Sequence, residues 1–152
     1  MCLVIEVDLL FMKQEISCLL IDDDADDREI FEIALKEIFY NSKFYGVPGG
    51  IEAIDLIESD KNFRPDFIFM DLNMPMMGGI ECFHELKKIP YLKHSSIIFY
   101  TTSSHDRDIT KAKELGSNHF LTKPSRIGDL SKILSELFKG NQNKYYLNEL
   151  LK

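Results

Sequence analysis

Apolar residues along this chain repeat with two different periods, and the two kinds of segment alternate. Five short apolar runs are typical of β-strands: residues 17–21, 43–47, 66–71, 96–101 and 119–122. After each run, apolar residues recur every three to four positions, which predicts helices over residues 26–40, 49–59, 80–89, 106–116 and 126–138. Strands that alternate with amphipathic helices form βαβ units. The pattern therefore predicts an α/β fold with a doubly wound, five-stranded parallel sheet and five flanking helices.

The two ends of the chain lie outside this pattern, so we divide it into an N-terminal extension (1–15), a central domain (16–138) and a C-terminal tail (139–152). Residues 3–11 alternate with a period of two, which favours an extra strand that pairs at a sheet edge or with a second copy in a homodimer. A translation start at Met12 is an equally good interpretation. Tyr146 and Leu150 have i, i+4 spacing, which favours a short docking or dimerisation helix; a frayed tail is the alternative.

Composition and charge narrow the classes of function. The 152 residues carry a net charge of −7, which argues against sequence-independent binding of nucleic acid. Residues 22–32 hold seven acidic residues and one basic residue, so most of the net charge is local. Three cysteines without a C-x-x-C pair indicate a reducing, cytoplasmic compartment. The apolar start contains Glu6 and Asp8 and lacks a basic region, so we expect neither a signal peptide nor membrane insertion.

Polar side chains stand where the predicted strands end. Asp22 and Asp23 follow the first strand, and the third strand ends in Asp71. Thr101 ends the fourth strand, and the fifth leads into Lys123. The carboxyl ends of parallel strands form one edge of the sheet, where such folds bind ligands. Three carboxylates at that edge favour a hard divalent cation such as Mg²⁺, and the hydroxyl and ammonium groups suit phosphoryl oxygens. The combination indicates phosphoryl transfer to a carboxylate.

Four motifs resemble those of a known family: LLIDDD, DFIFMDLNMPMMGG, IIFYTT and FLTKP, in this order. They are similar to motifs of the receiver domain of bacterial two-component response regulators, and the resemblance covers residues 16–138. It implies a flavodoxin-like sheet with strand order 2-1-3-4-5, as in stand-alone receivers of the chemotaxis-regulator type. It also implies a phosphoprotein that acts as a signalling switch and catalyses only its own phosphorylation and dephosphorylation.

The resemblance implies a role for each matching residue around the phosphoryl group. Asp71 resembles the phosphoacceptor that takes a phosphoryl group from a sensor histidine kinase. Asp23, Asp71 and the backbone carbonyl of Asn73 resemble the direct Mg²⁺ ligands. Asp22 resembles the acidic residue that holds the ion through water.

The resemblance also implies a switching device. Thr101 resembles the hydroxyl residue that moves to the phosphoryl group, and Lys123 resembles the lysine that pairs with it. The peptide bond between Lys123 and Pro124 corresponds to a cis bond of the family, so we expect a cis bond here. Phe120 occupies the position of an aromatic residue that turns inward when the threonine moves. The expected output is a change in partner binding.

Partner and function leave alternatives open. The stretch YTTSS resembles stand-alone receivers paired with bacterial phytochromes, which suggests a phytochrome-like kinase. The chain alternatively passes its phosphoryl group on to a histidine phosphotransfer protein. A haloacid-dehalogenase-type phosphatase would use Asp22 and Asp24, but it would leave Asp71 without a role and would need a further acidic pair.

The rest of the acidic cluster has simpler interpretations. An EF-hand loop that opens at Asp22 is excluded, because Asp27 replaces the required glycine and Ile33 the required glutamate. Asp24, Asp26 and Asp27 are interpreted as the start of a helix, with Asp26 or Asp27 as its N-cap.

Overall fold

The computed structural model of this protein describes residues 15–38 and 41–152. The extra strand expected near the N-terminus, and the homodimer contact suggested for it, lie outside the described residues.

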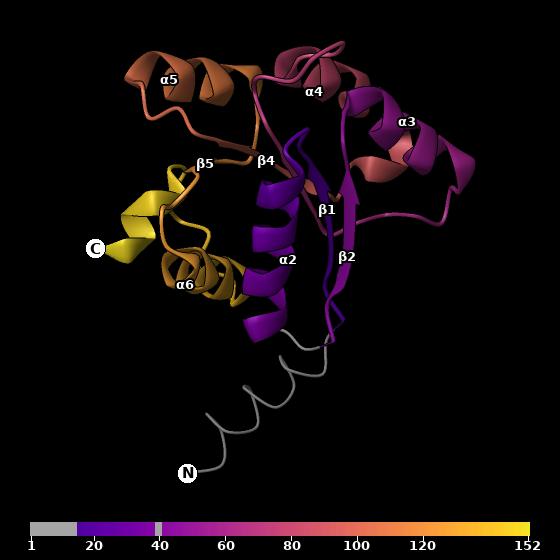
Figure 1. The fold of residues 1–152 in the computed structure, drawn as a ribbon. Coiled ribbons are helices and arrows are strands. Elements are labelled where there is room, and N and C mark those ends of the chain that lie inside the picture. The colour runs from indigo at the N-terminus through magenta and orange to yellow at the C-terminus, as the bar shows by residue number, and fades with distance from the viewer. Residues whose placement is uncertain (1–14, 39–40) are drawn as a thin grey trace.

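The core of the fold is one parallel sheet (Figure 1). Its strands are β1 (Ser17–Ile21), β2 (Lys43–Val47), β3 (Phe67–Met70), β4 (Ser96–Thr101) and β5 (His119–Thr122). They lie in the order β2-β1-β3-β4-β5, and all four neighbouring pairs are parallel. This order confirms the predicted flavodoxin-like topology. Because β3 lies at the centre between β1 and β4, and β5 follows β4 at one edge, the carboxyl ends of β1, β3, β4 and β5 lie side by side.

Within the described residues, five α-helices cover the sheet: α2 (Ala25–Ile38), α3 (Gly50–Ser59), α4 (Gly79–Lys87), α5 (Asp106–Leu115) and α6 (Ile127–Phe138). Helices α2 and α6 pack together on one face, and α3, α4 and α5 lie on the other (Figure 1). None of the helices in the described part of the chain is long and apolar enough to cross a membrane.

Burial of both faces explains the continuous apolar runs of the inner strands. In β1, Cys18 and Leu20 enter the cluster beneath α2 and α6, whereas Leu19 and Ile21 enter the cluster beneath α3, α4 and α5. All four side chains are fully buried. Alternate residues of a strand point to opposite faces, so a doubly covered strand needs a continuous apolar run. The run must therefore end where the strand leaves the two layers, and polar residues follow it.

Helix α2 begins with a different cap from the one predicted. The Asp24 Oδ1 atom accepts hydrogen bonds from the backbone N–H groups of Asp26 (2.9 Å) and Asp27 (3.4 Å). The Asp24 carbonyl accepts the first helical bond, from the Arg28 N–H at 3.1 Å. Asp24 is therefore the N-cap, and the prediction of Asp26 or Asp27 was wrong because helical geometry already begins at Ala25.

The C-terminal tail folds back onto the domain. After α6 the chain turns through Gly140, whose φ of +92° lies in the left-handed region that favours glycine. It then forms a parallel bridge between Tyr146 and Phe120 of β5, and ends in the 3₁₀-helix η2 (Leu147–Leu151). Helix η2 contacts both β5 and α6 (Figure 1). The tail thus covers the free edge of β5.

Candidate metal and phosphoryl site

Backbone hydrogen bonds between neighbouring strands bring Asp22, Asp23 and Asp71 close together. The Asp22 N–H donates to the Val47 carbonyl at 3.1 Å, and the Asp71 N–H donates to the Ile21 carbonyl at 3.0 Å. These bonds continue the β1 pairings with β2 and β3 by one residue. One carboxylate oxygen each from Asp22, Asp23 and Asp71 lies within 4.8 Å of the other two. Asp22 is fully buried, Asp71 is 9% exposed and Asp23 faces solvent.

Lys123 supplies the positive charge at the centre of this cluster. Its Nζ atom lies 2.7 Å from Asp22 Oδ2, 2.7 Å from Asp27 Oδ2 and 3.2 Å from Asp71 Oδ2. The same ammonium group lies 5.4 Å from the centre of the Tyr100 ring. Burial alone lowers the pKa of Lys123, but its bonds to Asp22 and Asp27 and the charges nearby outweigh burial and raise it. Lys123 is therefore a cation at any physiological pH.

Asp27 is the member of the site that sequence reasoning missed. Its position in the first turn of α2 suggested a role at the helix start, yet its side chain points to Lys123, 96 residues away. The sequence offers only a weak signal, since Asp27 lies in the first turn of the helix that directly follows Asp22 and Asp23. Asp24, by contrast, is exposed and caps α2, so it does not face the site. The phosphatase alternative, which needs Asp24 as a second catalytic carboxylate, therefore loses its basis.

The donor set fits a hard divalent cation. Among the described residues, two buried side-chain oxygens lack a hydrogen-bond partner: Asp22 Oδ2 and Thr101 Oγ1. Asp22 Oδ2 does form the 2.7 Å ion pair with Lys123, without the alignment of a hydrogen bond. Burial raises the pKa of Asp22, partly opposed by its bonds from Lys123 and from the Asp24 N–H. The clustered carboxylates of Asp22, Asp23 and Asp71 have one ammonium group beside them, so negative charge remains unbalanced and a cation would neutralise it.

Thr101 is the last residue of β4, the strand next to β3, and Asp71 directly follows β3. The Thr101 side chain is fully buried, and its backbone carbonyl accepts a 2.7 Å hydrogen bond from the Lys123 N–H. Asn73 lies on the loop after β3, where its N–H donates to Asp71 Oδ1 at 3.3 Å. The structure thus gathers Asp22, Asp23, Asp71 and Lys123 at one place, and links Asn73 and Thr101 to them through backbone hydrogen bonds.

The peptide bond after Lys123 differs from expectation. No cis peptide bond occurs between described residues, so the bond from Lys123 to Pro124 is trans, and the predicted cis bond was wrong. The local sequence contains only the weak preference of an X–Pro bond, about 0.5–1 kcal/mol in favour of trans. The expectation of a cis bond came from the family resemblance alone. No feature of this sequence favoured it independently.

Comparison with known proteins agrees with this geometry. The sequence model described as the response regulator receiver domain matches residues 18–135. The chain belongs to this family. This receiver domain is 29% identical over 120 residues to response regulator Rcp1 of Synechocystis sp., covering 76% of this chain and 82% of Rcp1. It is 25% identical to chemotaxis protein CheY-3 of Vibrio cholerae, covering 84% and 95% of the two chains.

Solved structures of receivers superpose on the same fold. The phosphorylated cyanobacterial phytochrome response regulator RcpA has a TM-score of 0.70 and 26% identity, covering 87% of this chain and 94% of RcpA. The Mn²⁺-bound form of response regulator Rcp1 has a TM-score of 0.69 and 26% identity, covering 84% and 95%. These matches confirm the family and the fold. Receiver domains are signalling switches of two-component systems.

The predicted aromatic switch residue lies inward in this receiver. Phe120 is fully buried, and its ring centre is 6.2 Å from that of Tyr146 in the C-terminal tail. Neighbouring Thr122 pairs in register with Thr101 across β4 and β5. The position expected to respond to the phosphoryl group is therefore in direct contact with the tail.

Proposed function

We propose that this receiver domain accepts a phosphoryl group on Asp71 from a sensor histidine kinase and, in response, changes its binding to a partner. The observation that carries the proposal is the cluster of Asp22, Asp23 and Asp71, whose carboxylate oxygens lie within 4.8 Å of one another, with Lys123 Nζ 3.2 Å from Asp71 Oδ2. A carboxylate that is 9% exposed and paired with a lysine, as Asp71 is, can act as a nucleophile toward phosphorus. The buried Thr101 hydroxyl, without a hydrogen-bond partner among the described residues, is available as a donor.

The chemistry follows from these positions. An Asp71 carboxylate oxygen attacks the phosphorus of the kinase phosphohistidine, so that a P–O bond forms while the P–N bond breaks and its electrons return to the imidazole. The Lys123 ammonium group stabilises the negative charge that develops on the phosphoryl oxygens. The Thr101 hydroxyl then donates to one of those oxygens. Asp22, Asp23, Asp71 and the Asn73 carbonyl would hold Mg²⁺, which supplies further neutralisation of charge when bound.

The partner kinase is proposed to be phytochrome-like. The stretch YTTSS supports this proposal, as does the similarity to a phytochrome response regulator at 26% identity. The protein is proposed to act in the cytoplasm, which agrees with the free, buried thiols of Cys18 and Cys82.

Intact-mass spectrometry tests phosphoryl acceptance. We expect the protein to gain one phosphoryl mass when it is incubated with fresh acetyl phosphate and Mg²⁺, and to gain none when EDTA is present. The Asp71→Asn variant should gain none, whereas Asp55→Asn, a matched change at an exposed aspartate of α3, should behave as wild type. A wild-type protein that never gains the mass, or an Asp71→Asn variant that still gains it, would contradict the proposal.

A second assay separates the two outputs of the switch. Phosphorylated protein is mixed with a histidine phosphotransfer domain, and the phosphoryl group is followed by mass. Transfer to the histidine domain would favour the shuttle alternative over action by contact.

A further inference from the structure

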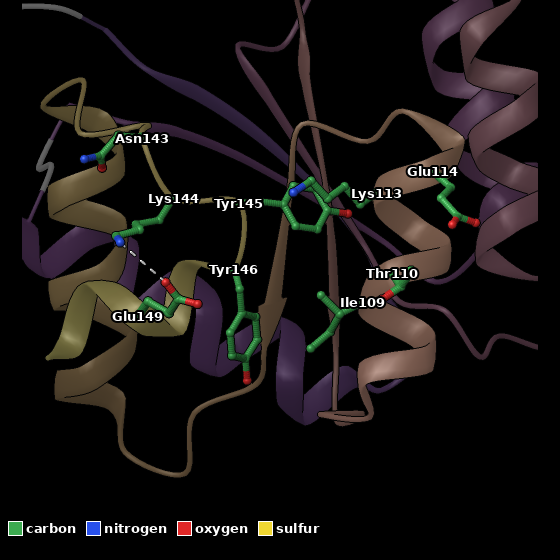
Figure 2. A pocket seen from close by; sticks show the side chains of 9 residues that line it. All are labelled: Ile109, Thr110, Lys113, Glu114, Asn143, Lys144, Tyr145, Tyr146 and Glu149. Carbon is green, nitrogen blue, oxygen red and sulfur yellow. Dashed lines mark ion pairs between the residues drawn. The ribbon is translucent and has the colours of Figure 1, made fainter.

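The C-terminal segment, Lys144–Leu151, behaves as a bound peptide on the edge of β5 (Figure 2). The Phe120 N–H donates to the Tyr145 carbonyl at 2.9 Å. The His119 ring nitrogen Nδ1 lies 2.8 Å from the Lys144 carbonyl and must be the donor, because a carbonyl only accepts. An edge strand presents unpaired backbone groups to solvent, and these contacts satisfy them.

Asn148 extends this pairing with its side chain. The Thr122 N–H donates to Asn148 Oδ1 at 2.9 Å, and Asn148 Nδ2 donates to the Thr122 carbonyl at 2.9 Å. One side-chain amide thus takes both hydrogen bonds that a neighbouring strand would make with Thr122. This two-bond contact is specific for asparagine, since the carboxylate of aspartate cannot donate.

The segment also packs against the apolar clusters on both faces of the sheet. Tyr145 and Tyr146 pack against the apolar cluster beneath α5, whereas Leu150 and Leu151 pack against the cluster beneath α6. The Tyr145 hydroxyl lies 2.7 Å from Ser117 Oγ. Between α5 and the segment a cavity of about 680 Å³ remains open, so the covering is incomplete (Figure 2). Leu147 is fully buried, but many of the other contacts of the segment are hydrogen bonds, which water can replace when the segment leaves.

Short contacts connect the segment to the phosphoryl site. Thr122 Oγ1 lies 2.9 Å from the Tyr146 hydroxyl and donates to the Ser103 carbonyl at 2.8 Å. Ser103 follows Thr101 by two residues, and Thr122 directly precedes Lys123. A movement of Thr101 toward Asp71 would draw the Ser103 carbonyl away from Thr122. The hydrogen bonds of Thr122 with Tyr146 and Asn148, which hold the segment, would then be weakened.

We propose that the edge of β5 is a peptide-binding surface whose resident ligand is the C-terminal segment, and that phosphorylation of Asp71 releases this segment. The exposed edge then accepts an extended segment of a partner protein by strand addition. The inference rests on the proposed function, because it needs the phosphoryl group on Asp71. It goes further in naming the surface that is regulated and the segment that blocks it.

Hydrogen exchange of the full chain, followed by NMR, tests this proposal. The reporters are the N–H groups of Phe120 and Thr122, which donate to the segment. Asn148→Ala should speed their exchange roughly tenfold, the factor that matches the loss of about one net hydrogen bond. Asn143→Ala is the matched control, because Asn143 is exposed and lies outside these contacts. Wild-type protein treated with acetyl phosphate and Mg²⁺ should show a similar increase, while amides of β1 stay protected.

Intact mass is measured on the same samples, so that two kinds of failure can be told apart. A sample that carries the phosphoryl mass but keeps full protection at Phe120 and Thr122 overturns the release of the segment. Equal exchange in Asn148→Ala and wild type overturns the peptide-like contact itself. A sample that never gains the phosphoryl mass overturns the proposed function, and this inference with it.

Discussion

At the scale of single residues, the central feature is one ammonium group shared by three carboxylates. Lys123 contacts Asp22 and Asp27 at 2.7 Å and Asp71 at 3.2 Å. Asp22 and Asp71 belong to the cluster of possible metal ligands, whereas Asp27 reaches the site from α2 through Lys123 alone and is 28% exposed. Asp27 therefore holds Lys123 and neutralises part of its charge without being a ligand itself. The negative charge of Asp27 therefore reduces the repulsion between Lys123 and a cation bound at Asp22, Asp23 and Asp71.

Replacement of Asp27 tests this role. We expect Asp27→Asn to weaken Mg²⁺ binding by roughly threefold to tenfold, because one anion is lost and the charge of Lys123 is less neutralised. Asp26→Asn is the matched control, since it removes the same charge one residue earlier from an exposed position. Isothermal titration calorimetry gives both affinities. An equal loss in the two variants would show that only the overall charge matters.

At the scale of elements, the turn between β3 and α4 depends on one glycine. The Gly79 N–H donates to the Leu72 carbonyl at 2.9 Å, so α4 starts directly against the loop that carries Asp71. A Cβ atom at Gly79 would lie 2.2 Å from the Asp71 backbone oxygen. No side chain can occupy that space unless the backbone of the site moves. The close approach therefore links the start of α4 to the position of Asp71.

A pair of glycine substitutions separates this steric effect from helix propensity. Gly79→Ala should lower the free energy of unfolding by about 1–3 kcal/mol, the usual cost of overpacking, and reduce phosphorylation of Asp71. Gly128→Ala in α6 meets no atom within 4 Å and should raise the free energy of unfolding by about 0.4–1 kcal/mol. Urea unfolding measures both values. A neutral Gly79→Ala variant would show that the turn can relax without cost.

At the scale of the whole molecule, His119 joins the sheet to the C-terminal segment and makes global stability depend on pH. Its side chain is buried, and burial lowers its pKa from the ordinary 6.5, opposed in part by bonds with backbone groups of Lys144 and Tyr145. Just below pH 6.5 the unfolded chain therefore binds more protons at this residue than the folded chain does. The contribution of neutral His119 to the free energy of unfolding is fully present above pH 6.5. It is lost as the pH falls from 6.5 through the lower pKa of the folded state.

Urea unfolding of wild type and His119→Gln at about pH 7.5 and about pH 5.5 checks this sign. We expect the free energy of unfolding of wild type to fall more over this interval than that of His119→Gln, because only wild type has the imidazole. The carboxylates contribute equally to both proteins, so the difference between them isolates His119. Equal pH dependence of the two proteins would contradict the burial effect.

Much of the element order could be predicted from local patterns. The strands from 17–21, 43–47, 96–101 and 119–122 were predicted to the residue, and the helices differ only at their ends. Local spacing suffices because a strand buried on both faces must be apolar throughout, whereas a covering helix needs only one apolar stripe. The site residues at the strand ends follow from the same reasoning, since parallel strands end at a common edge.

The sequence by itself determined the alternation of strands and helices, the family, and the residues that meet at the carboxyl edge of the sheet. Only the tertiary structure decided that Asp27 pairs with Lys123, that Asp24 caps α2, and that the C-terminal segment closes the edge of β5. The physical reason is distance along the chain. Periodicity reports which side of an element is buried, but it contains no information on which exposed polar groups meet across 26 or 96 residues.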